Sequence, residues 1–219
     1  MCGRYSIGSD IADISQTLGV APPAEFTPRY NAAPSQALPV VSNTDPQRVS
    51  LYTWGVVAFW AKEKGQRLIN ARAETVAEKS TFKQSFRQRR CWVLADGYYE
   101  WQKTKAGKVP HRLVRTDEQP MVFAGLWDEH VDQETGEVRH DFCIITTEAS
   151  PSIAHIHNRM PAMLAADNRS LWLSDTEDYA GLQSLLRPLA DEQIRAYEVS
   201  KLVNNVQNDD VSLTRLNSK

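Results

Sequence analysis

The first residues of the chain carry the most distinctive chemistry of the sequence. The chain opens Met1-Cys2-Gly3, and removal of the methionine would leave Cys2 with a free α-amine and a thiol on adjacent carbons. The amine titrates at about 7.7–8.0 and the thiol at about 8.5, so both react close to neutral pH. The amine can capture an aldehyde as an imine, and the sulfur can then close a five-membered thiazolidine ring. Position 2 alone, however, favours the simpler interpretation of a small buried residue.

Two internal stretches carry groups that could serve such chemistry. In Asn70-Ala71-Arg72-Ala73-Glu74 an extended backbone would place an amide, a cation and a carboxylate on one face, although the pattern alone favours a solvated polar face. In Gly97-Tyr98-Tyr99-Glu100-Trp101 a single carboxylate stands among large aromatic residues. Burial there would raise the pKa of Glu100 into the range of a proton-transfer group, while an exposed edge-strand glutamate fits the pattern equally well.

A third stretch, His155-Ile156-His157-Asn158-Arg159, contains two histidines. Their i, i+2 spacing does not place two ligands on one helix face, so we expect no zinc site. His157 could act as a general acid or base, and Arg159 could hold a phosphate, but a structural histidine is the more common outcome for such a residue alone.

Composition limits the class of protein. The chain has 219 residues, 42% of them hydrophobic and 24% charged, with a formal net charge of −2, so any nucleic-acid binding requires a local basic surface. The three cysteines, Cys2, Cys91 and Cys143, form neither a disulfide framework nor a CxxC metal motif. No signal-peptide core is present and no apolar run approaches the roughly 18 residues of a membrane span, so we expect a cytoplasmic protein without a membrane partner.

The elements that position these residues are mostly short strands. An amphipathic stretch ends at Gly19, Ser80 could cap a short helix, Ser150-Pro151 is typical of a helix start, and Tyr179–Leu189 predicts a longer helix. Residues 55–69 are expected to form a loop. Strands are expected at Ala37–Val41, Val49–Trp54, Cys91–Ala95, Tyr98–Gln102, Arg112–Arg115, Met121–Leu126, Phe142–Thr147 and Arg195–Val199. The pattern predicts a single α+β domain with a strand-rich, barrel-like core decorated by short helices.

Seven motifs occur in one order along the chain, and together they are far more specific than any one alone. The series resembles the SRAP (SOS response-associated peptidase) family of abasic-site processing proteins, of the compact bacterial type. It consists of Cys2-Gly3-Arg4, Arg29-Tyr30-Asn31-Ala32-Ala33-Pro34, Trp54-Gly55, Asn70–Thr75, Gly97–Trp101, His157-Asn158-Arg159-Met160-Pro161 and the segment from Val199-Ser200 to Asp210. The resemblance implies one domain over residues 2–210, followed by a tail at 211–219.

The resemblance implies a covalent chemistry for the N-terminus. In this family an exposed N-terminal cysteine reacts with the ring-opened aldehyde of an abasic site in single-stranded DNA, and a thiazolidine crosslink shields the lesion. Cys2 would supply amine and thiol, Asn70 would orient the sugar or the linkage, Glu100 would move protons during formation and reversal, and His157 would help to open the sugar ring. No cofactor or metal is implied. Self-removal of Met1, self-reversal of the crosslink and weak strand-cleaving lyase activity would accompany this chemistry.

The resemblance also implies which residues meet the DNA. Guanidinium groups would hold the flanking phosphates, Trp60 would act as a wedge or stacking surface, and the loop Asn31–Pro34 would line the site. The guanidinium groups are those of Arg4, Arg72 and Arg159. A monomer associated with the nucleoid or the replication fork is expected.

Two positions depart from the family pattern. Asn158 stands where many relatives carry an aspartate beside the histidine, and Val56-Val57-Ala58 replaces a segment that often contains proline.

Two alternative functions also stay open from the sequence. One is an N-terminal-nucleophile peptidase or amidohydrolase, with Cys2 attacking a carbonyl and Asn70 aiding the oxyanion. The other is a single-strand binding module in which Cys2 is incidental.

Overall fold

The computed structural model describes residues 2–57, 67–131 and 136–217. Four α-helices are present there, α1 (Ile11–Leu18), α2 (Ser80–Gln88), α3 (Arg169–Leu173) and α4 (Tyr179–Ser184). Single 3-10 turns lie at η1 (Ala166–Asn168), η2 (Asp191–Gln193), η3 (Lys201–Asn204) and η4 (Val211–Thr214). The strands are β1 (Tyr5–Ile7), β2 (Arg29–Ala32), β3 (Ala37–Ser42), β4 (Ser50–Trp54), β5 (Val56–Val57), β6 (Arg67–Leu68), β7 (Asn70–Arg72), β8 (Arg90–Ala95), β9 (Gly97–Thr104), β10 (Gly107–Arg115), β11 (Met121–Val131), β12 (Val138–Glu148), β13 (Arg159–Pro161) and β14 (Ile194–Glu198).

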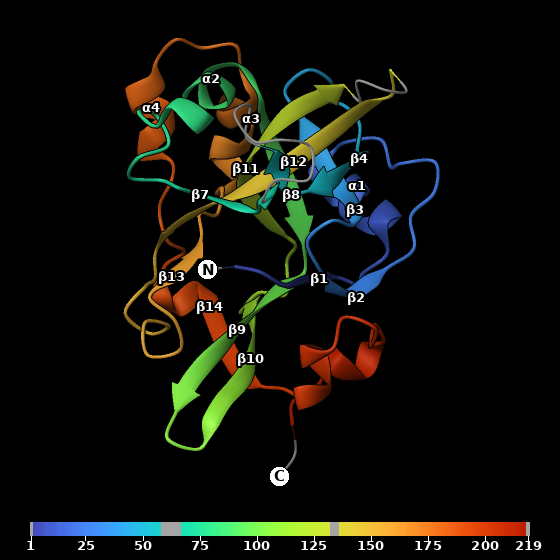
Figure 1. The fold of residues 1–219 in the computed structure, drawn as a ribbon, viewed down its shortest axis with the longest axis vertical. Helices are drawn as coiled ribbons and strands as arrows, with labels where there is room; N and C mark the ends of the chain where they lie inside the picture. The colour runs from blue at the N-terminus through green and yellow to red at the C-terminus, as the bar shows by residue number, and fades with distance from the viewer. Residues whose placement is uncertain (1, 58–66, 132–135, 218–219) are drawn as a thin grey trace.

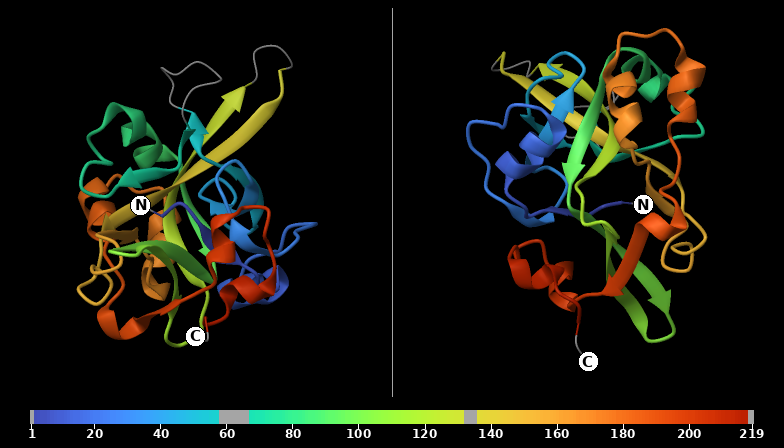
Figure 2. Two further views of the ribbon diagram at one scale, coloured as in Figure 1. Left: turned by 60° about the horizontal axis from the view of Figure 1, so that its bottom comes forward. Right: turned by 180° about the vertical axis from the view of Figure 1, so that it is seen from behind.

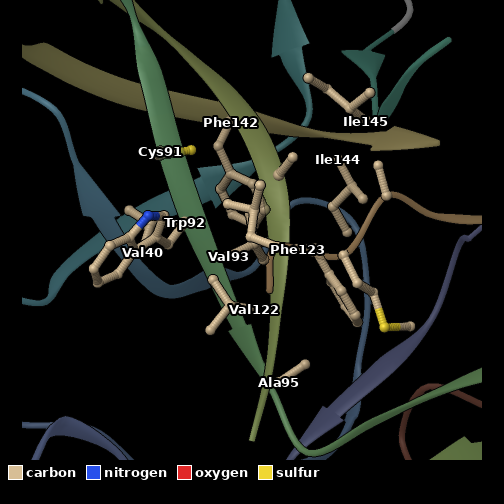
Figure 3. Close-up of a cluster of buried hydrophobic side chains, with 14 of the residues drawn as sticks. Val40, Cys91, Trp92, Val93, Ala95, Val122, Phe123, Phe142, Ile144 and Ile145 are labelled. Atoms are coloured by element: carbon tan, nitrogen blue, oxygen red, sulfur yellow. The ribbon is translucent and has the colours of Figure 1, made fainter. Parts of the chain in front are cut away.

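Five of these strands close into a barrel. They follow one another in the order β11-β8-β3-β4-β12, and the additional pairing of β11 with β12 joins the two ends (Figure 1). Alternate side chains of the strands point inward, because successive residues of a strand face opposite sides. Buried side chains such as Val93, Phe123, Phe142 and Ile144 fill the interior (Figure 3). The prediction of an α+β fold with a barrel-like β core is confirmed.

A second sheet, of order β14-β10-β9-β1-β2, lies beside the barrel. It is joined to the barrel at the corner where β8 ends at Ala95 and β9 begins at Gly97. The carboxylate of Asp96 fixes this corner, because it accepts the backbone N–H of Gly8 at 2.6 Å and pairs with Arg112 at 2.8 Å. The segment leading into β1 therefore runs between the barrel and the β9–β10 hairpin (Figure 1).

Helices α2 and α3 contact the barrel strand β8, with α2 also reaching β11. The apolar face of α2 buries Phe82 and Phe86. Ser80 is the first residue of this helix and not its cap, since Lys79 occupies the cap position and makes no side-chain hydrogen bond. The C-terminal turns η3 and η4 lie beside the second sheet (Figure 2). Their side chains Val203 and Leu213 pack with Tyr99 of β9.

Three local expectations differ from the structure. Residues after Ser150-Pro151 form a hydrogen-bonded turn rather than a helix, because the N–H groups of Ile153 and Ala154 return to Ser150 and β13 then begins at Arg159. The expected loop at 55–69 contains the paired strands β5 and β6. Helix α4 ends at Ser184, before the expected Leu189.

The C-terminal segment beyond residue 210 also packs against the fold. Leu213 is fully buried, and the N–H of Asn217 donates to the carbonyl of Glu198 at 2.9 Å. The division into a domain at 2–210 and a tail at 211–219 stays a prediction. No helix within the described residues is both long and apolar enough to cross a membrane.

Candidate functional site

The N-terminal segment is held in place by Asn70. The side-chain N–H of Asn70 donates to the main-chain carbonyl of Cys2 at 2.8 Å, although the two residues are 68 positions apart. Strand β7 brings Asn70 there, because it pairs in parallel with β12 and sets Asn70 beside Ile144. The carbonyl oxygen of the Asn70 side chain is buried and has no hydrogen-bond partner among the described residues. Asn70 thus positions Cys2 and still offers one acceptor.

The thiol of Cys2 points into the protein. Its side chain is 0% exposed, and the S–H donates to the carbonyl of Arg4 over a long 3.9 Å. Burial, and after it the nearby carboxylate of Glu100, hold the pKa of the Cys2 thiol well above its ordinary value. The structure therefore differs from the expected exposed cysteine: in the chain with residue 1 attached, the sulfur is covered and protonated.

Glu100 is a buried carboxyl group in the same region. It lies on β9 opposite His111 of β10, and only 3% of its surface is exposed. Burial raises the pKa of Glu100 to about 7, and the positive charge of the amino terminus is the largest effect that opposes the rise. The sequence left burial and exposure equally open, and the structure decides for burial. A carboxyl group of this pKa can both give and take a proton near neutral pH.

His157 follows the turn after Ser150-Pro151. The Nδ1 atom of His157 lies 3.0 Å from the backbone N–H of Arg159 and 3.3 Å from the carbonyl of the same residue; because the shorter contact comes from a group that can only donate, we assign the proton of the neutral ring to Nε2. Burial lowers the pKa of His157, and the charges of the amino terminus and of Lys103 add to that effect. His157 is therefore a neutral hydrogen-bond donor through Nε2 at neutral pH. Lys103, whose charge reaches this site, was not among the predicted site residues, although it lies only three positions beyond Glu100.

The predicted phosphate-binding arginines differ in how available they are. Arg72 is exposed at the end of β7. Arg159 instead makes a two-pronged ion pair with the carboxylate of Glu74 at 2.7 and 2.9 Å, and it also donates to the carbonyl of Thr146. The hydrogen bonds from Arg159 hold the pKa of Glu74 below its ordinary value. Arg159 therefore needs to exchange Glu74 for a phosphate if it is to hold DNA.

Arg4 and Asn31 hold the C-terminal loop. Arg4 donates to the side-chain oxygen of Asn31 at 2.7 Å and to the carbonyl of Val203 at 2.9 Å. The fully buried Asn31 amide in turn donates to three loop carbonyls, and the carboxylate of Asp209 accepts the backbone N–H of Asn31 at 2.9 Å. The segment 199–210 is dense in short polar side chains, a composition that favours structural loops, and these hydrogen bonds tie it to the fold. A DNA contact by Asn31 itself would have to be indirect, and that predicted role stays a prediction.

Pro34 and Trp60 are the two remaining predicted DNA contacts. Pro34 is half-buried at the turn that follows β2. Trp60 lies outside the described residues, as does Ala58 of the altered segment. Asn158 is exposed.

The site combines an anchored N-terminus, a buried carboxyl group and a neutral imidazole with cations at its margin. No group of three or more histidine, cysteine or acidic side chains that could hold a metal is found among residues 2–57, 67–131 and 136–217. These groups can transfer protons while a nucleophile adds to a carbonyl or imine carbon.

Comparison with known proteins gives consistent results. Residues 1–206 match the family model described as SOS response associated peptidase (SRAP). The abasic site processing protein YoqW of Bacillus subtilis (strain 168) is 36% identical over 223 residues, which cover 97% of this chain and 98% of YoqW. The abasic site processing protein HMCES of Gallus gallus is 32% identical, over 84% of this chain and 65% of HMCES. A crystal structure of a protein from Bacteroides thetaiotaomicron superposes with a TM-score of 0.89 at 25% identity, over 99% of this chain and 100% of that one.

Proposed function

The chain belongs to the SRAP family, and from that premise we propose that it processes abasic sites in single-stranded DNA by a covalent reaction of Cys2. The observation that carries the proposal is the hydrogen bond from Asn70 to the Cys2 carbonyl, beside a buried Glu100 whose pKa is raised to about 7. Relatives that align over nearly their whole length are named abasic site processing proteins, which supports the same substrate.

The first step is attack by the α-amine that removal of Met1 frees on Cys2. The amine adds to the aldehyde of the ring-opened deoxyribose, and loss of water gives an imine. Glu100 can take a proton from the attacking nitrogen and deliver one to the departing oxygen, because its pKa lies near neutral pH. His157 can donate through Nε2 to the ring oxygen of the sugar as the aldehyde opens. The free side-chain oxygen of Asn70 can accept a hydrogen bond from the amine.

The second step is ring closure by the thiol. The sulfur attacks the imine carbon, and the product is a thiazolidine that links the protein to the DNA. Reversal follows the same path backwards, with Glu100 returning its proton. β-Elimination from the imine would give the weak lyase activity that accompanies such chemistry. The DNA backbone is held by Arg72 at the margin, and by Arg159 once it releases Glu74.

The burial of the thiol argues against a peptidase as the main activity. A cysteine nucleophile acts as the thiolate, and burial keeps the Cys2 thiol protonated. An amine-first reaction does not need the thiolate at the start. Removal of Met1 is then a maturation step that uncovers the amine.

A denaturing gel tests the proposal. Protein whose mass shows the absence of Met1 is incubated with a single-stranded oligonucleotide that bears one abasic site, alongside Cys2→Ala and Cys143→Ala as a matched cysteine control. We expect a slow-migrating adduct with the first and the third protein and none with Cys2→Ala. Turnover of peptides without a DNA adduct would favour the peptidase, and salt-sensitive binding without adduct or turnover would favour a binding module.

A further inference from the structure

Two buried tyrosines that belong to the same core cluster as Cys2 have no part in the mechanism above. Tyr5 on β1 and Tyr98 on β9 are direct partners in the antiparallel pairing of these strands. Both side chains are fully buried, and neither hydroxyl has a hydrogen-bond partner among the described residues. An unpaired buried hydroxyl lowers stability, whereas phenylalanine would fill the same space without that cost. The pair therefore calls for a functional explanation.

The two rings pack against the same aromatic side chain of the core. Both stand edge-on to Phe123, with ring centroids 6.2 Å from Tyr5 and 6.1 Å from Tyr98. Tyr5 also packs against Trp54, whose ring N–H donates to the carbonyl of Ile69, the residue before Asn70. The two tyrosines thus share one buried layer with the elements that anchor Cys2.

Both hydroxyls stay protonated in these surroundings. Burial raises the pKa of both hydroxyls well above the ordinary value, and the Cys2 thiol is the next largest contributor for each. Both groups therefore stay protonated and can act as hydrogen-bond donors. The other titratable groups that act on the Cys2 sulfur are Glu100 and the amino terminus. The guanidinium of Arg4 is bound to Asn31 and to the C-terminal loop instead.

Hydrogen-bond donors at the Cys2 sulfur would stabilise the transition state of ring closure. The sulfur forms a bond to the imine carbon, the π electrons of the C=N bond move to nitrogen, and the thiol proton ends on that nitrogen. Negative charge develops on sulfur before the bond is complete, in surroundings that disfavour charge. The contact that the S–H makes here, with the carbonyl of Arg4, stabilises only the thiol.

We propose that the hydroxyls of Tyr5 and Tyr98 donate hydrogen bonds to the Cys2 sulfur as the thiazolidine closes. The inference rests on the proposed function, because it assigns donors to the second step of that reaction. Neither hydroxyl is hydrogen-bonded to the sulfur among the described residues. The Cys2 side chain turns from the Arg4 carbonyl toward the tyrosines when it reacts.

The test uses Tyr5→Phe and Tyr98→Phe, with Tyr99→Phe as the matched control. Tyr99 is also fully buried and lies between Tyr98 and Glu100, but its hydroxyl donates to the carbonyl of Tyr30 on β2. Single-turnover reactions with abasic DNA are quenched with and without borohydride, which traps the imine but not the thiazolidine. We expect unchanged imine formation in all three variants. We expect ring closure to slow by about tenfold or more in Tyr5→Phe and in Tyr98→Phe, and the pH profile of the closure rate to move to higher pH.

The inference is overturned if imine formation and ring closure slow equally. It is also overturned if Tyr5→Phe and Tyr98→Phe behave like Tyr99→Phe. A second readout needs no DNA: the pH dependence of iodoacetamide alkylation at Cys2, located in the N-terminal peptide by mass spectrometry. We expect alkylation to require higher pH in Tyr5→Phe and Tyr98→Phe than in wild type, and an unmoved profile overturns the inference. If wild-type protein forms no adduct, the proposed function fails, and the alkylation profiles still decide the role of the hydroxyls.

Discussion

Glu100 links the pH dependence of stability to that of the chemistry. Burial raises its pKa from 4.5 to about 7, so the folded state binds this proton more tightly than the unfolded state does. The favourable contribution is fully present below pH 4.5 and is lost as the pH rises through about 7. At about 1.4 kcal/mol for each pH unit, ionisation lowers the free energy of unfolding by about 3 kcal/mol. Only 3% of the residue is exposed, so solvent screening does not reduce this magnitude much.

Urea unfolding at several pH values from about 4.5 to about 8 measures this effect. Glu100→Gln cannot ionise, so we expect its stability relative to wild type to increase by about 3 kcal/mol across this interval. Glu78→Gln, which changes an exposed glutamate, should follow wild type. The rate of crosslinking should change near pH 7 in wild type, whereas Glu100→Gln should be slow at every pH with DNA affinity largely retained. Parallel stability curves, or loss of DNA binding in step with the chemistry, would refute the assignment.

Three further substitutions test other parts of the site. Asn70→Ala removes the hydrogen bond to the N-terminal main chain and should slow crosslinking about tenfold in a gel time course, and an unchanged rate would contradict its positioning role. Glu74→Gln releases Arg159, so single-strand affinity measured against salt should rise and the salt slope should steepen by about one phosphate contact, whereas weaker binding would show that the ion pair itself is needed. Asn31→Ala leaves loop carbonyls unpaired and should lower the free energy of urea unfolding by about 3 kcal/mol, with faster proteolysis at 201–208; a stability equal to wild type would be inconsistent with the structural role.

The sequence predicts the parts of this molecule that depend on local patterns. The strands of the barrel follow from apolar alternation between turn residues, and the structural loop at 199–210 follows from its density of short polar side chains. The aromatic neighbours of Glu100 indicate that burial is one of two outcomes, but the choice between them depends on β10 and β1, which pack from elsewhere in the chain.

The remaining features depend on contacts between distant segments. The hydrogen bond of Asn70 to Cys2 requires the parallel pairing of β7 with β12, which no local pattern encodes. The proline after Ser150 fits the first residue of a helix, yet the strand at Arg159 leaves room only for a turn. Arg4 illustrates the same limit, because its hydrogen-bond partners lie 27 and 199 residues away in the sequence.

The central claim is that the amine and the sulfur of Cys2 both become bonded to one carbon of the abasic sugar. The most direct measurement is mass spectrometry of the N-terminal peptide from a DNA adduct that was unfolded and treated with borohydride and iodoacetamide. The account predicts a peptide that begins at Cys2, carries the sugar remnant, gains no hydrogen from borohydride and has no thiol left to alkylate. A remnant on another residue, or a Cys2 thiol that is still free for alkylation, would contradict it.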